Sequence, residues 1–323
     1  MMIDRLAGNA ALKDSVRLML GSRRLTHSVL LVGEEGLGAG FAARCIAADY
    51  LYPAGGAPAE ALLRGECCRA VGKPGDRDSG HVETGIVREA ISVAGMGAGG
   101  KYLVSQVKAM RSEIFNTSLS AEGRAVLLYH VEKMNEESAN ALLKVMEEPP
   151  EGVLFLLTAD SLAGVLPPIR SRCAAYTMAP VPTEECAAAL RTAQPELNEQ
   201  NAQDLAFLYE GHIGLCLKAL TDPAAKVARA AARELCRQAQ QQDTYRVQAL
   251  LAGYEKDKDS AAAVLWQATQ AASAALRRPG FDGVQPDTAA RILRAAEAAR
   301  RAMKANGNLR LALTVCGMEM AAR

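Results

Sequence analysis

The chain has 323 residues, half of them hydrophobic and only 4% aromatic, and its formal net charge is +1. A single domain usually holds about 100–200 residues, so we expect two or three compact units. The small net charge excludes a protein that binds nucleic acid through a strongly basic overall balance, so any DNA contact must come from a local patch. Long tracts rich in alanine and leucine favour a largely helical protein with aliphatic cores.

The cysteines and the N-terminal residues give information on where in the cell the protein is located. The eight cysteines form no CxxC pair and have no regular spacing, which favours reduced thiols in a cytoplasmic protein. The opening MMIDRLAGNAALKDSV carries charge early and has no apolar core of a signal peptide, and nowhere do 18 apolar residues run together. We therefore expect neither secretion nor a membrane-spanning segment.

The first part of the chain predicts a helix, a strand, a glycine-rich loop and a second helix. Residues 9–20 place apolar side chains at helical spacing and end at Gly21, a natural helix stop. Residues 28–32 have the sequence SVLLV, which is typical of a strand buried on both faces. The segment GEEGLGAG follows at residues 33–40 and leads into a helical pattern at 41–51.

The next segments alternate between irregular and regular structure. We predict loops at residues 53–60 and 94–100, which are rich in glycine, and a turn-rich stretch at 67–85 without a clear assignment. A helical period predicts a helix over residues 104–116. Residues 125–129, with the sequence AVLLY, form another buried strand.

The pattern continues with a helix over residues 136–147, which Pro149 and Pro150 end, and a buried strand over 152–158. Strands and helices thus alternate through the first part of the chain. This order is typical of a parallel α/β sheet covered on both faces, and we assign it to residues 1–176.

The remaining residues are helical in pattern. Three short helical segments suggest a small lid-like bundle over residues 177–222. Residues 223–323 are almost wholly helical, with breaks at 257–259, 277–283 and 306–308. The predicted fold class is therefore an α/β parallel-sheet module, followed by a small helical lid and an all-α domain.

A buried strand, a glycine-rich loop and a helix together form a phosphate cradle, because backbone N–H groups and a helix N-terminus converge on one anion. A working loop of the pattern G-x-x-x-x-G-K-[ST], the Walker A motif, needs a lysine for the phosphates and a hydroxyl for magnesium. Here Gly33, Gly36 and Gly38 are present, but Ala39 stands in place of the lysine and Gly40 in place of the hydroxyl residue. We predict that this site binds nucleotide very weakly or not at all. The alternative is that the segment is an ordinary glycine-rich turn.

The strand at residues 125–129 gives an independent test. In a nucleotide hydrolase it should end in acidic residues that hold magnesium and orient water, but the next residues are His130, Val131 and Glu132. In extended chain, Glu132 would lie roughly 6–7 Å beyond His130. Two separate catalytic elements are therefore missing: the lysine and hydroxyl of the glycine-rich loop, and the acidic residues after this strand.

Three segments carry a resemblance to a known family. Residues 138–173, SANALLKVMEEPPEGVLFLLTADSLAGVLPPIRSRC, closely resemble the bacterial clamp-loader ATPases of DNA polymerase III, which belong to the AAA+ family. RLTHSVLLVG, at residues 24–33, is similar to the entry strand of that family, and residues 306–320, NGNLRLALTVCGMEM, to its last collar helix. The resemblance implies an AAA+ module, a lid and a collar domain that assembles into a hetero-oligomeric ring.

Within this resemblance, Ser171, Arg172 and Cys173 match the SRC motif of the family, whose arginine reaches across a subunit interface to ATP held by a neighbour. A planar, permanently charged guanidinium suits the charge that develops on a transferring phosphoryl group. Taken alone, an arginine after a strand is usually surface charge. A broken loop with a retained arginine finger implies a non-catalytic ring subunit without its own ATPase activity, unlike the gamma/tau ATPase.

The resemblance also implies partners. These are the gamma/tau ATPase subunits and the delta subunit, the sliding clamp indirectly, and primed DNA in the assembled complex, for which Lys108 and Arg111 are candidate contacts. We expect no cofactor and no metal, since Cys67 and Cys68, with His81 as the nearest further ligand, fall short of a four-ligand zinc site. Two rival functions are a self-sufficient ATPase with a divergent loop and an adaptor of the same fold outside the replisome.

Overall fold

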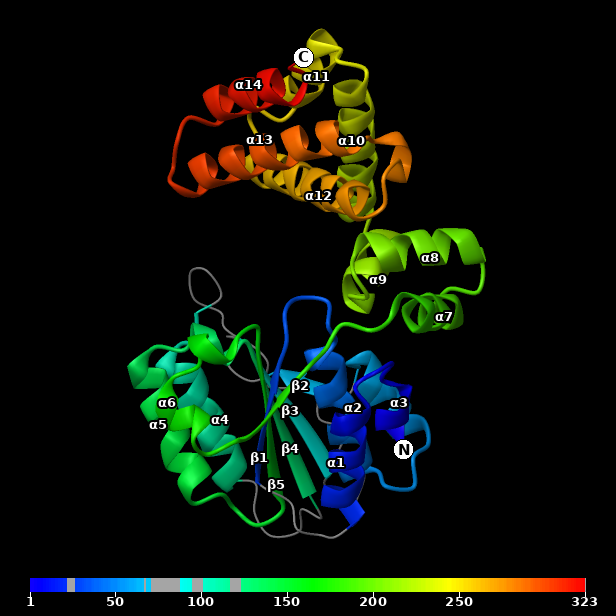
Figure 1. Ribbon diagram of the computed structural model, residues 1–323. Helices are drawn as coiled ribbons and strands as arrows, with labels where there is room; N and C mark the ends of the chain where they lie inside the picture. Colours follow the sequence, from blue (N-terminus) through cyan, green and yellow to red (C-terminus); the bar gives the residue numbers. More distant parts are fainter. Residues whose placement is uncertain (22–26, 67, 71–87, 95–100, 117–122, 323) are drawn as a thin grey trace. The chain divides into compact units, whose positions relative to one another are not determined.

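The computed structural model divides into two compact units, Met1–Glu185 and Cys186–Arg323. All strands lie in the first unit, and the second is helical (Figure 1). The structure describes residues 1–21, 27–66, 68–70, 88–94, 101–116 and 123–322.

The first unit is built on a six-stranded parallel sheet with the order β2-β3-β4-β5-β1-β6. This arrangement confirms the predicted α/β fold class. The order places β1 between β5 and β6, so the glycine-rich segment that follows β1 leaves from the interior of the sheet. The strands are β1 (Ser28–Val32), β2 (Cys68–Ala70), β3 (Arg88–Ala94), β4 (Gly123–Tyr129), β5 (Val153–Ala159) and β6 (Ala174–Thr177).

Helices cover both faces of the sheet, and each face has its own hydrophobic core (Figure 1). Alternate side chains of β1 belong to the two cores. Leu31 packs in the core with helices α1 to α3, whereas Leu30 packs in the core with α4 to α6. Burial on both faces explains why the four residues after Ser28 in this strand are all apolar. Among the residues that the structure describes, the helices on these faces are α1 (Ala10–Gly21), α2 (Ala39–Leu51), α3 (Ala57–Arg64), α4 (Val104–Asn116), α5 (Glu136–Glu147) and α6 (Pro167–Arg170).

Most predicted boundaries of this unit are confirmed, and α4 and α5 match at both ends. The loop predicted over residues 53–60 is wrong from Ala57 on, because α3 begins there with Pro58 in its first turn, a position that proline favours. Strands β2, β3 and β6 were not predicted. The last of them, β6, is a short edge strand of four residues, all partly or fully exposed, so it has no apolar run that would reveal it.

The second unit is helical, and several of its helices begin with a polar side-chain cap. The side chains of Asn198, Asp222 and Asp257 each accept a hydrogen bond from a backbone N–H of the helix that follows, which stabilises those termini. No helix in the described ranges is both long and apolar enough to cross a bilayer. The helices are α7 (Thr183–Ala193, which begins in the first unit), α8 (Glu199–Leu208), α9 (Ile213–Thr221), α10 (Pro223–Gln240), α11 (Thr244–Ala252), α12 (Lys258–Arg277), α13 (Pro286–Lys304) and α14 (Leu309–Met320).

The predicted lid helices contact the predicted collar within this unit. The Tyr209 hydroxyl donates to Gln267 Oε1 at 2.7 Å. The guanidinium groups of Arg277 and Arg278 lie 5.0 and 4.5 Å from the centre of the Phe207 ring, within the range of cation–π attraction. The lid and the collar therefore share one compact unit, and the boundary between them at residue 222 stays a prediction.

Asp49 anchors the N-terminal segment to α2. Its buried carboxylate accepts hydrogen bonds from the N–H groups of Met2 at 2.6 Å and Ile3 at 2.9 Å. Hydrogen bonds to a charged group contribute about 1.5–3 kcal/mol each. We expect Asp49→Ala to lower the free energy of unfolding by about 3 kcal/mol in urea titrations. Asp14→Ala, which removes an exposed carboxylate, is the control, and equal losses in both variants would contradict this assignment.

Candidate functional site

The glycine-rich loop, residues 33–40, joins the buried strand β1 to helix α2. The N–H of Gly33 donates to the carbonyl of Ala159 at 2.9 Å, which fixes the start of the loop to the end of β5. A Cβ on Gly33 would lie 2.8 Å from Cβ of Met178, so only glycine is tolerated there. Gly36 and Gly38 have φ values of 95° and 88°, which favour glycine. The loop therefore has the strand–loop–helix geometry that the sequence predicts.

Helix α2 begins at Ala39, two residues before the predicted start, and Gly38 is its N-cap. The side chain of Ala39 is buried. A Cβ on Gly40 would lie 3.4 Å from Cε1 of Tyr129, so the aromatic ring that ends β4 lies against the first turn of α2. At the two positions where a nucleotide-binding loop has its cation and its hydroxyl, this chain thus presents a methyl group and a glycine.

The chain after β4 does not stay extended, and the prediction that Glu132 lies beyond His130 is wrong. His130 adopts a left-handed conformation with φ of 58°, and the 3-10 helix η3 (Val131–Lys133) follows. Glu132 therefore folds back, and its Oε1 lies 3.3 Å from Nδ1 of His130. The N–H of His130 donates to the Thr158 hydroxyl at 3.2 Å, which ties the ends of β4 and β5 together.

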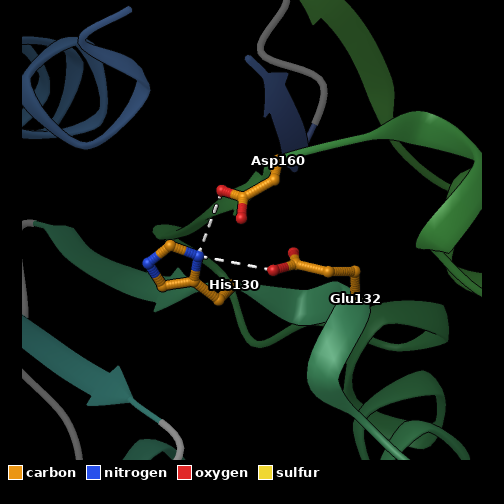
Figure 2. Close-up of side chains that lie close together, drawn as sticks. All are labelled: His130, Glu132 and Asp160. Carbon is orange, nitrogen blue, oxygen red and sulfur yellow. Dashed lines mark ion pairs between the residues drawn. The ribbon is translucent and has the colours of Figure 1, made fainter. Parts of the chain in front are cut away.

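Asp160, directly after β5, also approaches His130, with its Oδ1 3.3 Å from Nδ1 (Figure 2). Asp160 was not among the predicted site residues. Its position offered a clue, since an acidic residue directly after a buried strand lies at the carboxyl edge of a parallel sheet, where ligands bind.

The SRC segment, Ser171 to Cys173, forms a tight turn between α6 and β6. The N–H groups of Ser171 and Arg172 donate to the carbonyls of Pro167 and Ile169, at 3.0 and 3.1 Å. The Ser171 hydroxyl donates to the Pro168 carbonyl at 3.1 Å. Since Ile169 is fully buried, this turn is anchored to the core and holds the Arg172 backbone in one place.

The Arg172 side chain reaches the surface, where 38% of it is exposed. Its guanidinium donates to Oε1 of Glu147 at 2.5 Å and to the carbonyl of Pro168 at 3.2 Å. Glu147, the last residue of α5, is 49% exposed. An ion pair exposed to this extent contributes about 0.2–1 kcal/mol, so an external anion can compete for Arg172 at low cost.

Cys173 faces the other way, toward the core on the α4–α6 face of the sheet. Burial raises the pKa of its thiol to about 12. The thiol is therefore neutral at physiological pH and serves in packing. We expect its alkylation by iodoacetamide at pH 8 to be about 10³-fold slower in the folded protein than in urea, because the thiolate reacts. Peptide mass spectrometry measures both rates, and equal rates would contradict the burial.

The glycine-rich loop and the SRC segment belong to opposite faces of the sheet. Ala39 packs in the core beneath α1 to α3, whereas Cys173 packs against the core beneath α4 to α6. The structure thus does not bring these two predicted features together on one face. The predicted ligands Cys67, Cys68 and His81 lie outside the residues whose side chains the structure describes.

Comparisons with known proteins agree with this architecture. Residues 8–182, more than half of the chain, match the family model described as DNA polymerase III, delta subunit. A Haemophilus influenzae protein named DNA polymerase III subunit delta-prime is 38% identical over 84 residues, which cover 26% of this chain and 25% of the relative. The delta-prime subunit of Bacillus subtilis is 27% identical over 160 residues, which cover 49% of this chain and 44% of the relative. The chain belongs to the DNA polymerase III delta-prime family.

The fold of this delta-prime family member is also similar to a solved structure. A gamma subunit-related protein of DNA polymerase III from Thermotoga maritima matches with a TM-score of 0.50 at 16% identity, over 94% of this chain and 98% of that one. This match extends through both units and supports the fold, an α/β parallel-sheet unit followed by a helical one. The matches to the curated delta-prime relatives span less than half of their length.

Proposed function

We propose that this protein is a non-catalytic clamp-loader subunit that helps to build the ring and supplies Arg172 to ATP held by a neighbouring ATPase subunit. One observation carries the proposal: Ala39 and Gly40 replace the groups that grip a triphosphate, while Arg172 is half-exposed on a rigid turn of the opposite face. An arginine placed in this way serves a phosphate outside its own chain better than one at its own loop.

In this mechanism Arg172 changes partners when a neighbour docks. In the free chain its guanidinium is held by Glu147 and by the Pro168 carbonyl. A phosphate oxygen carries more charge than a solvated carboxylate and accepts a bidentate pair of N–H groups, so it displaces Glu147. The guanidinium then neutralises charge that develops on the transferring phosphoryl group, while the anchored backbone of the SRC segment keeps it positioned.

The proposed partners are the gamma/tau ATPase subunits and the delta subunit in the cytoplasm. The sliding clamp would be handled through the assembled ring. Lys108 and Arg111 are both exposed and lie three residues apart on α4, so they share one face of that helix and can contact the phosphates of primed DNA.

Co-assembly tests the proposal. The full chain mixed with gamma/tau and delta should elute as one complex in size-exclusion chromatography, and adding it should raise the ATP turnover of the gamma/tau subunits. If the chain stays apart from that complex, the adaptor hypothesis is favoured instead. If the chain alone turns over ATP at the rate of the complex, the hypothesis of a self-sufficient ATPase is favoured.

A further inference from the structure

Three potential metal ligands meet at the carboxyl edge of the sheet, within the part of the chain that the structure describes (Figure 2). They are His130 after β4, Glu132 in η3 and Asp160 after β5. Nδ1 of His130 lies 3.3 Å from one oxygen of each carboxylate. All three ligand atoms lie within 4.8 Å of one another.

The backbone holds this cluster in place. The left-handed turn at His130 is fixed by the hydrogen bond from its N–H to Thr158, and the N–H of Lys133 closes the turn by donating to the His130 carbonyl at 3.0 Å. A Cβ on Gly164 would lie 3.0 Å from Cβ of Glu132, so the chain packs closely over the glutamate. The three side chains are therefore brought together before any ligand arrives.

Among the described residues, Glu132 has no hydrogen bond that compensates its burial, and its one ionic neighbour is the His130 ring. Both of its carboxylate oxygens are almost fully covered, and neither has a hydrogen-bond partner among the described residues. Only 14% of the side chain is exposed. A buried carboxylate without a donor is costly, and a cation at its oxygens removes that cost.

The distances match metal coordination better than a hydrogen bond. The edge of a tetrahedron is about 1.63 times the metal–ligand distance, so a zinc ion bound at about 2.0–2.1 Å needs ligand atoms roughly 3.3 Å apart. Nδ1 of His130 is 3.3 Å from each carboxylate oxygen, whereas N–H···O bonds are usually about 2.7–3.2 Å long. Asp160 is 48% exposed and can adjust to close the third edge.

We propose that His130, Glu132 and Asp160 form a binding site for one divalent transition-metal ion, such as Zn²⁺. One imidazole nitrogen and two carboxylate oxygens suit ions of the zinc, cobalt and manganese type, whereas Mg²⁺ and Ca²⁺ prefer oxygen ligands alone. Three protein ligands leave the fourth position for water. The ion links the ends of β4 and β5 without any nucleotide, independently of the role of Arg172.

A protonated His130 between the two carboxylates is the competing account. The two accounts differ in what each side chain does when metal is added. If the cluster is a metal site, the chain binds added metal and loses this binding when His130 is replaced, because the neutral imidazole is a ligand. If an imidazolium bridges the two carboxylates instead, the chain binds no added metal even with His130 in place.

Cobalt titration of the full chain tests the site, because Co²⁺ takes the place of Zn²⁺ and absorbs visible light. Cys67→Ser/Cys68→Ser serves as the background, so that those thiols do not contribute. We expect one equivalent of Co²⁺ per chain, a rise in the melting temperature, and at least a tenfold loss of affinity in His130→Gln and in Asp160→Asn. His27→Gln, which changes another exposed histidine, is the control and should bind as the background does.

The outcomes decide the proposal in either direction. Equal Co²⁺ binding by the background and by His130→Gln overturns it, as does the absence of stoichiometric binding in the background. If the His130 variant is poorly folded, Asp160→Asn tests metal binding independently. Asp160 is exposed, so the circular dichroism spectrum of the Asp160→Asn variant should match that of the background. Loss of binding in both variants, with His27→Gln unaffected, supports the site.

Discussion

Replacing Arg172 with alanine is expected to lower ATP turnover at the neighbouring site that it completes by about 10³-fold or more, the usual effect of removing an arginine finger. Arg172→Lys should recover little of this rate, because an ammonium group lacks the planar fork of donors. The ring should still assemble and the chain should still fold, since the pair with Glu147 is exposed and contributes about 1 kcal/mol at most. Steady-state ATPase assays on the reconstituted complex measure the effect.

Arg170→Ala is the matched control for this experiment. Arg170 is exposed, carries the same charge and lies two residues away at the end of α6. It should leave turnover unchanged. If Arg172→Ala and Arg170→Ala give the same rate, general surface charge explains Arg172, and its proposed role is excluded.

Rebuilding the glycine-rich loop should restore phosphate binding but not hydrolysis. In Ala39→Lys/Gly40→Ser, the new ammonium group gains a contact with a charged phosphate of about 1.5–3 kcal/mol, which corresponds to roughly a 10- to 150-fold gain in ATP affinity. A Cβ at position 40 fits, since it would lie 3.4 Å from the ring of Tyr129. Turnover should stay absent, because His130 follows β4 where an acidic pair would hold magnesium.

Isothermal titration and a phosphate-release assay on the isolated chain separate these two effects. Ala39→Met/Gly40→Ser, which adds a long neutral side chain, controls for changes in packing and should gain no affinity. Hydrolysis by the lysine variant would contradict the claim that the end of β4 is a second missing element.

Much of the first unit could be predicted because β1, β4 and β5 are buried on both faces. Continuous apolar runs such as residues 28–32 have no other stable place, so β1, the loop after it and α5 could be predicted closely. The loop pattern with Ala39 and the SRC segment with Arg172 could likewise be found, because each depends on residue type at a fixed spacing.

The cluster around His130 could not be predicted, because it depends on one unusual backbone conformation. A histidine with positive φ is uncommon, and nothing in the local pattern specifies it. The conformation is fixed by Thr158, which is distant in sequence and reaches His130 only when β4 and β5 pair. Strand β6 was missed for a related reason, since an exposed edge strand has no apolar run.

ATP binding and turnover by the isolated wild-type chain, with magnesium present, test the central claim most directly. The account predicts no detectable hydrolysis and no saturable binding at ATP concentrations that saturate the assembled complex. Brisk magnesium-dependent hydrolysis by this chain alone would contradict it, because the chain would then hold a triphosphate without the charged groups that such a site needs.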